Sequence, residues 1–588
     1  MYQWSLNKLY SSLEDPRYLG DLAQVDLLIK ENENLLASKA SYEASIFLEK
    51  ALLLQEELTI LFSKLFQFVS LSLATDVSNV LFNNALVGLR KKFVATTLSR
   101  TQLERYISNL ANLEEVIKTS SYLEKYRFIL LEIKNNSLHL LSDQEEVLAS
   151  ELNQSGGSLF AKMQGDLTST LNVDYKGEVI ALSKVRNLAY SSDSNVRKEA
   201  YFAEMKSYEK INKATSFALH GIKKEVLTMS KKRKFASPLE ETLVNSRLTK
   251  KALDALLQAM GESLDDFRAY LKQKALLLGH KNGLPFYDLF APMGSLTSKY
   301  TIEEAQEFIL THFYSYANDL GDLAKRAFNE QWIDYLPKQG KRGGAFCAGI
   351  YAIKESRILT NYDGSIGDIS TLAHELGHAY HNYHLRNEAP LNTSYPMPIA
   401  ETASILCETI VKKKALELAK TQEEKIGLIE QELQDATQVI VDIYSRYLFE
   451  AEVFARIENE FLNEDALDKI MLKAQLASYG DGLDPNYLHP RMWINKSHYY
   501  STGRSYYNFP YAFGLLFAKG VYAKYQEQGP AFTKEIAKLL AMTGKSSILD
   551  VSKEIGIDIE NPTYWKKALN IIKDDIDTFI KLTNQKTT

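Results

Sequence analysis

Cysteine and proline are scarce in this sequence, which has 2 cysteines and 13 prolines among its 588 residues. The two cysteines, Cys347 and Cys407, form no Cys-x-x-Cys pair. They leave room for at most one bridge, so a disulfide framework is excluded and a reducing compartment is favoured. Few prolines mean few helix breaks, and the composition therefore predicts long, uninterrupted helices.

An excess of positive charge is also missing. The chain has 69 lysines and arginines against 74 aspartates and glutamates, a formal net charge of −5 at pH 7. A general nucleic-acid binder usually shows a basic excess. The basic run Ser230–Lys234 stands at the end of a predicted helix, where positive charges suit the helix dipole and a solvated turn. We therefore expect no nucleic-acid partner.

Long apolar segments are equally rare. Residues 1–7 show no basic region followed by an apolar block, so no signal peptide is predicted. The most apolar early stretch, residues 58–77, contains Lys64, Gln67 and several serines. It fits a buried helix of a bundle better than a membrane span. We predict a cytoplasmic protein with no membrane partner.

What the sequence does contain is helical periodicity. Across residues 15–152, apolar residues recur at intervals of three and four with charges between them. Further helices are predicted at residues 196–229, 249–278, 302–328 and 423–462. β-Structure is limited to a hairpin within 168–182, which turns near 176–177, and to a small sheet or hairpin within 343–363. The predicted fold is mainly α.

A His-Glu-x-x-His motif runs from His374 to His378. Residues four apart lie on one face of an α-helix, so the two imidazole rings can converge on one metal ion. Glu375 lies about 100° around the helix, within reach of a metal-bound water. Asp368 and Ser370 are the candidate N-caps. On this segment alone, a buried helix with two satisfied histidines is the alternative.

A catalytic zinc ion usually takes three protein ligands, so the motif needs one more. Glu401 follows two prolines in the first turn of a predicted helix, has no basic partner nearby in the sequence, and is the candidate. Glu408 returns to the same face seven residues later and can orient a ligating histidine. For both glutamates the alternative is a solvated helix carboxylate. The helix turns His381 and His384 away from the face that carries His374 and His378. We therefore expect these two histidines to pack in the protein or to lie outside the ligand set.

A tyrosine-rich segment surrounds Gly503. It contains one histidine and several phenols, namely His498, Tyr499, Tyr500, Tyr506, Tyr507 and Tyr511. In a dry cleft such groups can donate hydrogen bonds to the oxyanion of a tetrahedral intermediate. An aromatic core cluster is the alternative, because tyrosines commonly pack in helical proteins. The residues alone leave both interpretations open.

Together these motifs resemble the oligoendopeptidase F branch of the thimet-oligopeptidase-like zinc metallopeptidases. The segments that carry the resemblance extend over nearly the whole chain and are residues 4–10, 357–364, 374–381, 398–404 and 498–514. The paired zinc motifs, 374–381 and 398–404, are the specific ones. We accordingly divide the chain into an N-terminal helical region of oligoendopeptidase type, residues 1–190, and a catalytic metallopeptidase region, residues 191–588.

The resemblance implies a multi-helix ellipsoid split by a deep substrate channel, with a small β-sheet beside the metal helix. It also implies one Zn²⁺ per chain, held by His374, His378 and Glu401, with Glu408 matching a carboxylate of the family's pattern. Short, unstructured oligopeptides would be cut internally, because folded proteins cannot enter the channel. We expect a monomer or a small homo-oligomer.

The expected reaction is zinc-assisted peptide hydrolysis. Zinc lowers the pKa of its water to about 7 and polarises the scissile carbonyl. Glu375 takes the proton as water attacks and passes it to the leaving amine. In the family a histidine and one or two tyrosines also polarise the carbonyl, which here implies His498, Tyr507 and Tyr511, with Tyr506 as a substitute for Tyr507.

Substrate binding is expected beside the small sheet. The strand predicted at Arg357–Tyr362 would hold a peptide by edge pairing, which tolerates varied sequences. Gly343 and Gly344 would allow the close approach of the peptide backbone.

Two rival functions share parts of this pattern. A zinc carboxypeptidase can carry the same ligands on a helical fold. A peptide-binding or chaperone-like protein can retain a vestigial site, although the intact His374, Glu375, His378 and Glu401 argue against it.

Overall fold

α-Helices make up most of this chain, as a computed structural model shows for residues 2–296 and 298–585, the part that the structure describes. The chain divides into two compact units, each built from three segments. Unit 1 comprises Met1–Leu138, Thr297–Lys414 and Lys524–Gly556, and unit 2 comprises His139–Leu296, Ala415–Ala523 and Ile557–Thr588. The predicted mainly α fold is confirmed. The predicted division at residue 190 falls inside unit 2 and stays a prediction, as does the substrate channel.

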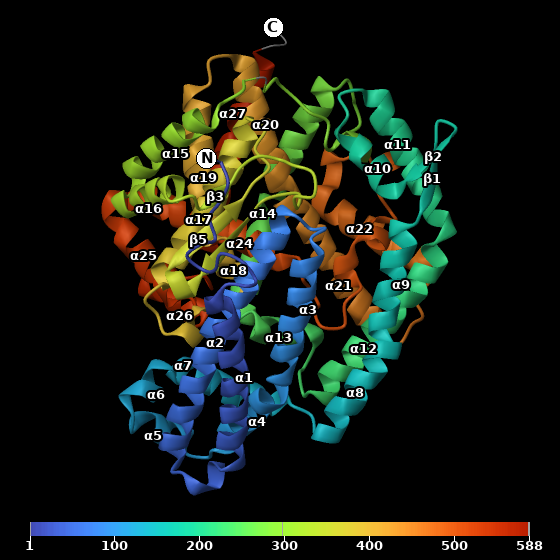
Figure 1. Ribbon diagram of the computed structural model, residues 1–588. Helices are drawn as coiled ribbons and strands as arrows, with labels where there is room; N and C mark the ends of the chain where they lie inside the picture. Colours follow the sequence, from blue (N-terminus) through green and yellow to red (C-terminus); the bar gives the residue numbers. More distant parts are fainter. Residues whose placement is uncertain (1, 297, 586–588) are drawn as a thin grey trace. The chain divides into compact units, whose positions relative to one another are not determined.

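Unit 1 contains the N-terminal helices, a three-stranded sheet and the helix with the His-Glu-x-x-His motif (Figure 1). Its helices are α1 (Pro16–Ala37), α2 (Ala44–Thr75), α3 (Val80–Ala95), α4 (Thr97–Asn109), α5 (Leu113–Lys118), α6 (Ser121–Lys125), α7 (Arg127–Asn136), α15 (Ile302–Tyr316), α16 (Asn318–Asn329), α17 (Ile366–Leu385), α18 (Met397–Ala400), α25 (Thr533–Met542) and α26 (Ile548–Glu554). Its strands are β3 (Ile333–Asp334), β4 (Phe346–Ile350) and β5 (Glu355–Leu359). Two helices belong to both units: α19 (Thr402–Leu418) begins in unit 1, and α24 (Phe509–Gln528) ends there.

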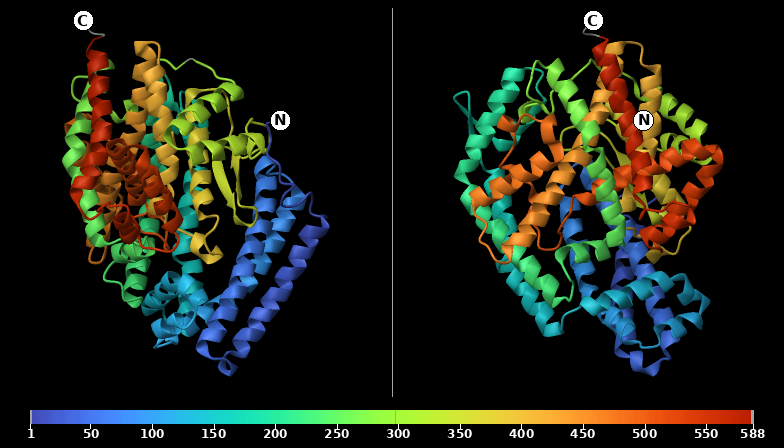
Figure 2. Two further views of the ribbon diagram at one scale, coloured as in Figure 1. Left: turned by 90° about the vertical axis from the view of Figure 1, so that its left-hand side faces the viewer. Right: turned by 180° about the vertical axis from the view of Figure 1, so that it is seen from behind.

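The most apolar helix of the N-terminal part, α2, packs against α1 and α3 (Figure 2). Its buried residues Phe62, Leu65 and Phe68 join one core with residues of α1 and with Ile350 of β4. Among the described residues, α2 is the one helix long and apolar enough to cross a membrane, and 44% of its apolar window is buried. Core helices commonly pass that test, and the packing agrees with the predicted buried helix of a bundle.

The sheet of unit 1 has the strand order β3-β5-β4, with β3 parallel and β4 antiparallel to β5. The register of the antiparallel pair runs from Phe346 opposite Leu359 to Ile350 opposite Glu355. Helix α17 packs against both β4 and β5. The small sheet predicted within 343–363, beside the motif helix, is confirmed.

The central strand of this sheet is β5, so the predicted edge pairing of a peptide with Arg357–Tyr362 is wrong. Beyond β5 the backbone still pairs on the β3 side, where the Thr360 N–H donates to the Asp334 carbonyl at 2.9 Å. The edge strand is β4. Gly343 and Gly344 precede β4, and a Cβ added at either would meet no heavy atom within 4 Å. Their proposed role in substrate approach stays a prediction.

Unit 2 consists of helices and one hairpin (Figure 1). Its helices are α8 (Asp143–Ser155), α9 (Gly157–Ser169), α10 (Leu182–Asn187), α11 (Ser194–Ser207), α12 (Asn212–Lys232), α13 (Pro238–Asn245), α14 (Lys250–Leu277), α20 (Gln422–Thr437), α21 (Ile443–Ile457), α22 (Glu464–Tyr479), α23 (Met492–Asn495) and α27 (Pro562–Asn584). The predicted hairpin is present as β1 (Asn172–Tyr175) and β2 (Glu178–Ala181), which pair antiparallel. Its turn, Lys176 and Gly177, takes positive φ values of 54° and 83°.

Two helices predicted as single are each broken in two. The prediction for 302–328 spans α15 and α16, which are separated because Ala317 is extended, with φ −156° and ψ 138°. The prediction for 196–229 spans α11 and α12, which are separated by a turn at Tyr208–Ile211. Tyr208 and Ile211 are buried. Packing of the turn therefore overrides the local helix pattern, which contains no proline or glycine to mark a break.

The other two predicted helices are present. The prediction for 249–278 matches α14. The prediction for 423–462 matches α20 and α21, which are joined without a break by a π-helical segment at Gln438–Asp442.

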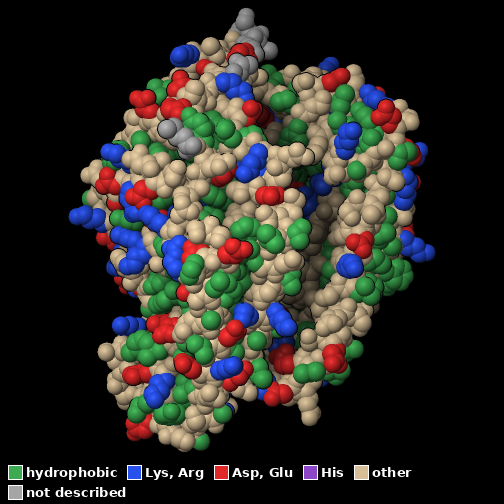
Figure 3. All heavy atoms as spheres, viewed as in Figure 1, with side chains coloured by type: hydrophobic (Ala, Val, Ile, Leu, Met, Phe, Trp, Pro, Cys, Tyr) green, Lys and Arg blue, Asp and Glu red, His purple; other side chains and the backbone are tan. Residues whose placement is uncertain are grey.

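Charged side chains of both signs are interspersed over the face shown in Figure 3, in keeping with the nearly balanced composition. The basic run Ser230–Lys234 lies at the C-terminal end of α12, as predicted. Lys231 there pairs with Glu458, and Arg233 Nη2 lies 2.7 Å from Glu146 Oε2. These charges complete local ion pairs at a helix terminus.

Candidate metal centre

The helix with the His-Glu-x-x-His motif, α17, begins earlier than predicted. Its N-cap is Ser365, whose Oγ accepts a hydrogen bond from the Asp368 N–H at 3.1 Å. The Asp368 carboxylate in turn accepts from the Ser365 N–H at 2.9 Å. This reciprocal capping box places Asp368 and Ser370 inside the helix, so both predicted N-caps are wrong. The Ser-x-x-Asp spacing was a readable signal for the true start.

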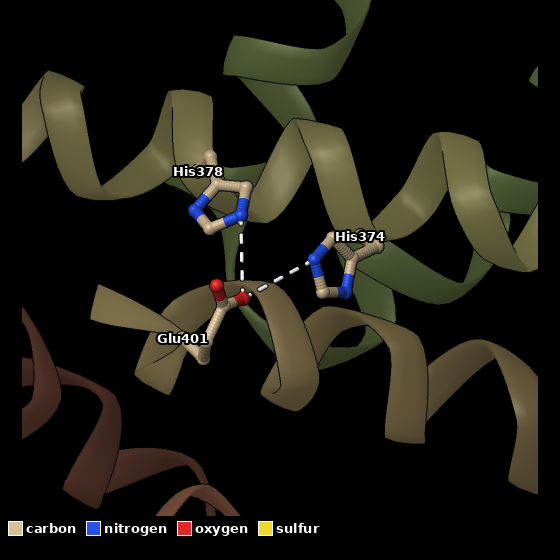
Figure 4. Close-up of side chains that lie close together, drawn as sticks. All are labelled: His374, His378 and Glu401. Carbon is tan, nitrogen blue, oxygen red and sulfur yellow. Dashed lines mark ion pairs between the residues drawn. The ribbon is translucent and has the colours of Figure 1, made fainter. Parts of the chain in front are cut away.

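Three half-buried side chains of unit 1 converge at one point: His374 and His378 of α17, and Glu401 (Figure 4). Glu401 Oε2 lies 3.3 Å from His374 Nε2 and 3.4 Å from His378 Nε2. One ligand atom from each residue lies within 4.8 Å of the other two. The structure thus brings together the three residues predicted as metal ligands.

Glu401 lies at the junction between α18 and α19, and not in the first turn of a helix as predicted. Its backbone, with φ −90° and ψ 3°, ends the short α18. Ser404 Oγ donates a hydrogen bond to Glu401 Oε2 at 2.8 Å and so helps to hold the carboxylate. Ser404 has no role among the sequence predictions, although its spacing of three from Glu401 was a usable signal.

Gly377 allows α17 to approach the start of α19. A Cβ added at Gly377 would lie 2.5 Å from both the carbonyl oxygen of Ala403 and the Cα of Ser404. Atoms of the backbone cannot give way without a shift of the helix. Because glycine within a helix costs about 1 kcal/mol relative to alanine, its presence inside the motif indicates such close packing.

Replacing Gly377 with alanine is expected to separate α17 from α19 and so to pull His378 away from Glu401. We expect a loss of about 1–3 kcal/mol of folding free energy from overpacking and a weaker affinity for metal. Thermal unfolding and metal titration measure the two effects. Gly20→Ala is the matched control, because Gly20 lies in α1 with no heavy atom within 4 Å of an added Cβ. Wild-type metal affinity in the Gly377 variant would contradict the packing argument.

Glu408 lies on the other side of the His374 ring. Its Oε2 is 2.9 Å from His374 Nδ1, and its Oε1 is 2.7 Å from Lys412 Nζ. A carboxylate that accepts a hydrogen bond from Nδ1–H leaves Nε2 as the lone-pair donor, which is the tautomer that a metal ligand requires. The predicted position of Glu408 behind a histidine agrees with this geometry. Lys412, four residues further along α19, was not predicted and neutralises the carboxylate from behind.

The charges of the cluster are strongly coupled. Burial lowers the pKa of His374, but hydrogen bonds with Glu401 and Glu408 outweigh burial and raise it to about 10. Burial raises the pKa of Glu401, but hydrogen bonds with His374 and His378 outweigh it and hold the pKa well below its usual range. The two carboxylates therefore favour a positive charge between them, which a proton on His374 or a bound metal ion would supply, and metal binding would release that proton. Two imidazole nitrogens and one carboxylate oxygen are the donors of a catalytic zinc site, so these residues fit zinc.

Glu375 is a buried carboxyl group next to this cluster. Its Oε2 has no hydrogen-bond partner among the residues that the structure describes. Burial raises the pKa of Glu375, and the nearby histidines oppose that shift. A carboxyl group with a raised pKa is suited to exchange protons near neutral pH. Burial, together with the charge of Glu375, also raises the pKa of the Cys347 thiol, which keeps that thiol neutral.

His381 and His384 lie outside the three-residue cluster, as predicted. His381 Nε2 is 2.9 Å from Thr543 Oγ1, and its ring stacks on Tyr395. Burial lowers the pKa of His381 to about 3 and that of His384 to about 4. Both are neutral packing residues of α17.

The predicted oxyanion donors lie in unit 2, and the structure brings them together there. The ring centroid of His498 is 4.9 Å from that of Tyr507, which is 5.8 Å from that of Tyr511. Tyr511 is 36% exposed and faces solvent in part. Tyr506 instead takes a φ of 51° and buries its ring against Tyr447 and Phe454. This places Tyr507, and not its predicted substitute Tyr506, beside His498.

The remaining tyrosines of that segment belong to the core. Tyr499 and Tyr500 are buried, and neither hydroxyl has a hydrogen-bond partner within the described part of the chain. Both readings of the segment therefore apply, each to different residues: Tyr499, Tyr500 and Tyr506 pack, while His498, Tyr507 and Tyr511 form a separate group. Burial and the nearby Arg446 lower the pKa of His498, which favours its neutral form.

Two protein-family models match this chain. The model of peptidase family M3 matches residues 187–571, and the model described as oligopeptidase F matches residues 109–172. The chain is 26% identical over 607 residues to an oligoendopeptidase F homolog of Borreliella burgdorferi, a match that covers 99% of this chain and 98% of that protein.

Solved structures share the fold. A peptidase from Chlamydophila abortus matches with a TM-score of 0.85 and 21% identity, over 99% of this chain and 98% of that one. Oligoendopeptidase-F from Enterococcus faecium matches with a TM-score of 0.69 and 19% identity, over 96% of this chain and 100% of that one. At these identities the likeness is one of fold.

Proposed function

Because this chain belongs to peptidase family M3 and is a peptidase, we propose that it is a zinc-dependent oligoendopeptidase that cleaves internal bonds of short, unstructured peptides. The observation that carries the proposal is the convergence of His374 Nε2 and His378 Nε2 on Glu401 Oε2, at 3.3 and 3.4 Å. These three residues would hold one zinc ion. When bound, zinc supplies Lewis acidity toward the scissile carbonyl and acidifies the attacking water.

Glu375 is proposed to move the proton. Its buried carboxyl group follows His374 directly in α17 and so lies at the edge of the ligand set. As general base it would take a proton from the attacking water, and as general acid it would return that proton to the leaving amine. The raised pKa of this carboxyl group supports its role as general acid, in which it returns the proton to the leaving amine.

Substrate binding is proposed to use β4. This strand is at the edge of the sheet and packs on α17, which carries two of the three proposed ligands, His374 and His378. A peptide that adds to a sheet edge is held through its backbone, so its side chains can vary. His498, Tyr507 and Tyr511 of unit 2 are proposed to polarise the substrate carbonyl.

Product mapping tests the proposal. Two mixed peptide libraries, one with both ends blocked and one with free ends, are incubated with the protein, with and without a chelator, and products are identified by mass spectrometry. We expect internal cleavage that the chelator abolishes. Turnover that needs a free carboxyl terminus would indicate the rival zinc carboxypeptidase. The absence of any chelator-sensitive turnover would indicate a peptide-binding protein with a vestigial site.

Glu408→Gln is expected to weaken zinc binding by about 10- to 100-fold, because the amide no longer fixes the tautomer of His374 as a carboxylate does. At saturating zinc, kcat should recover most of its wild-type value. Competition with a metal-sensitive dye measures the affinity, and peptide turnover at several zinc concentrations measures the recovery. Unchanged zinc affinity would remove Glu408 from the metal centre.

Compartment and assembly follow as part of the same proposal. We propose a cytoplasmic enzyme, on the scarcity of cysteine, and a monomer or small homo-oligomer that acts on oligopeptides without nucleic-acid or membrane partners.

A further inference from the structure

Unit 2 contains a cavity of about 360 Å³. Its walls come from α10, α11, the segment around Phe286–Phe290, the π-helical segment Gln438–Asp442 and residues 489–496. Cavities of a few hundred cubic ångströms are typical of small-ligand sites, and π-helical segments often occur at functional sites. All of these residues lie in unit 2, whereas the three-residue metal cluster lies in unit 1.

Lys496 supplies an unpaired positive charge to this cavity. The other cations that line it are paired: Arg186 Nε lies 3.2 Å from Glu204 Oε1, and Arg197 Nε lies 2.7 Å from Asp288 Oδ1. Lys496 Nζ has neither a hydrogen bond nor an ion pair with any residue that the structure describes. Of these three cations, Lys496 alone therefore has no carboxylate in contact.

Two carboxylates that line the cavity, Asp442 and Glu204, favour the positive charge of Lys496 at a distance, but neither contacts Lys496 Nζ. Asp442 Oδ2 pairs with Arg446 Nη2, four residues along the helix. Burial, together with the nearby Arg446, lowers the pKa of Lys496 to about 8. The ammonium group is still mostly charged at pH 7, and a half-buried positive charge with no carboxylate in contact is costly. An anionic ligand would remove that cost.

The cavity also offers an apolar surface, because Phe286, Tyr287 and Phe290 line it with aromatic rings. A ligand that suits both Lys496 and these rings has an anionic group and an apolar side chain.

We propose that this cavity binds a small carboxylic acid with an apolar side chain, with its carboxylate on Lys496 and its side chain against these aromatic rings. The net charge of −1 of such a molecule matches the single unpaired cation. The lining contains neither the proposed metal ligands nor the proposed oxyanion donors, although Lys496 precedes His498 by two residues, and the inference adds a ligand site to the proposed peptidase function.

Isothermal titration calorimetry of the full chain tests the proposal with two probes, N-acetylphenylalanine and N-acetylphenylalaninamide. These probes share the same body and differ in the carboxylate. We expect one site per chain for the acid and at least about tenfold weaker binding of the amide, because a charged hydrogen bond is lost. Lys496→Met should weaken binding of the acid by about tenfold or more, whereas Lys496→Arg should retain it. Lys250→Met, at an exposed lysine of α14, is the matched control.

Each titration is repeated after dialysis against a chelator. Binding in the cavity should survive the loss of metal, whereas a carboxylate bound at the metal centre would not. No turnover is measured, so the result is independent of the proposed peptidase activity. Equal binding of acid and amide, an unchanged Lys496→Met variant, or loss of binding with the metal would each overturn the proposal.

A second pair of variants keeps the proposal testable if Lys496→Met fails to fold. Ala189 lines the cavity and is half-buried. Ala189→Glu adds a negative charge there and should weaken binding of the acid by about tenfold, while Ala189→Gln should not. If both variants bind the acid equally well, the cavity does not prefer an anionic ligand and the proposal is wrong.

Discussion

Glu375→Gln is expected to lower kcat for peptide hydrolysis by roughly 100- to 10,000-fold, because glutamine has the shape of glutamate but cannot accept the proton of the attacking water. Zinc content should stay near one ion per chain, since His374, His378 and Glu401 are unchanged. Burial also favours the neutral amide, so the fold should not suffer. The measurements are turnover of an internally cleaved peptide and metal content after dialysis.

The control for this variant is Glu57→Gln, at an exposed glutamate of α2. It should leave kcat and metal content at wild-type values. If Glu375→Gln retains activity within about tenfold of wild type, another group acts as the base. If it loses zinc as well as activity, Glu375 supports the metal centre structurally and its assignment must change.

Glu401→Ala is expected to weaken zinc binding by at least about 100-fold. Apparent zinc affinities in proteins correspond to about 10–16 kcal/mol shared among four ligands, so removal of one ligand costs several kcal/mol. His374 and His378 would lose the carboxylate oxygen that both now contact at 3.3 and 3.4 Å. Dialysis against a weak chelator should strip the variant while the wild type keeps its metal.

Glu417→Ala provides the comparison, because Glu417 is an exposed glutamate of the same helix, α19. It should keep its zinc and its activity. Full metal retention in Glu401→Ala would show that Glu401 is not a ligand. Excess zinc should restore part of the activity of Glu401→Ala but none to Glu375→Gln, so the two variants separate metal binding from proton transfer.

The parts of the site that could be predicted are those set by helix geometry alone. His374 and His378 share a face because they are four residues apart, and the structure brings both rings to Glu401. Glu408 was predicted behind a histidine from its spacing of seven from Glu401, and it reaches His374 Nδ1. The mainly α fold and the hairpin at β1 and β2 followed in the same way, from apolar periodicity and turn residues.

The parts that could not be predicted depend on contacts distant in sequence. Ala317 is extended although neither it nor its neighbours are helix breakers, and the adjacent Tyr316 packs against Tyr525, more than 200 residues away. Tyr506 and Tyr507 are adjacent and chemically identical, yet the positive φ of Tyr506 turns one ring into the core and leaves the other beside His498. The cavity at Lys496 joins segments more than 200 residues apart, so no local pattern reveals it.

The order of the ligands along the chain has a consequence for how the metal centre forms. His374, His378 and Glu401 all belong to one continuous stretch of unit 1. A metal ion that joins them closes only a short loop, and the entropy cost of closure rises slowly from a small value at such lengths. A zinc ion bound there would cross-link α17 and the start of α19, and its binding free energy would shift the local opening equilibrium of those helices toward the closed state. Removal of the metal should speed hydrogen exchange first in α17 and the start of α19, while helices remote from the metal site keep the slow hydrogen exchange of a folded core.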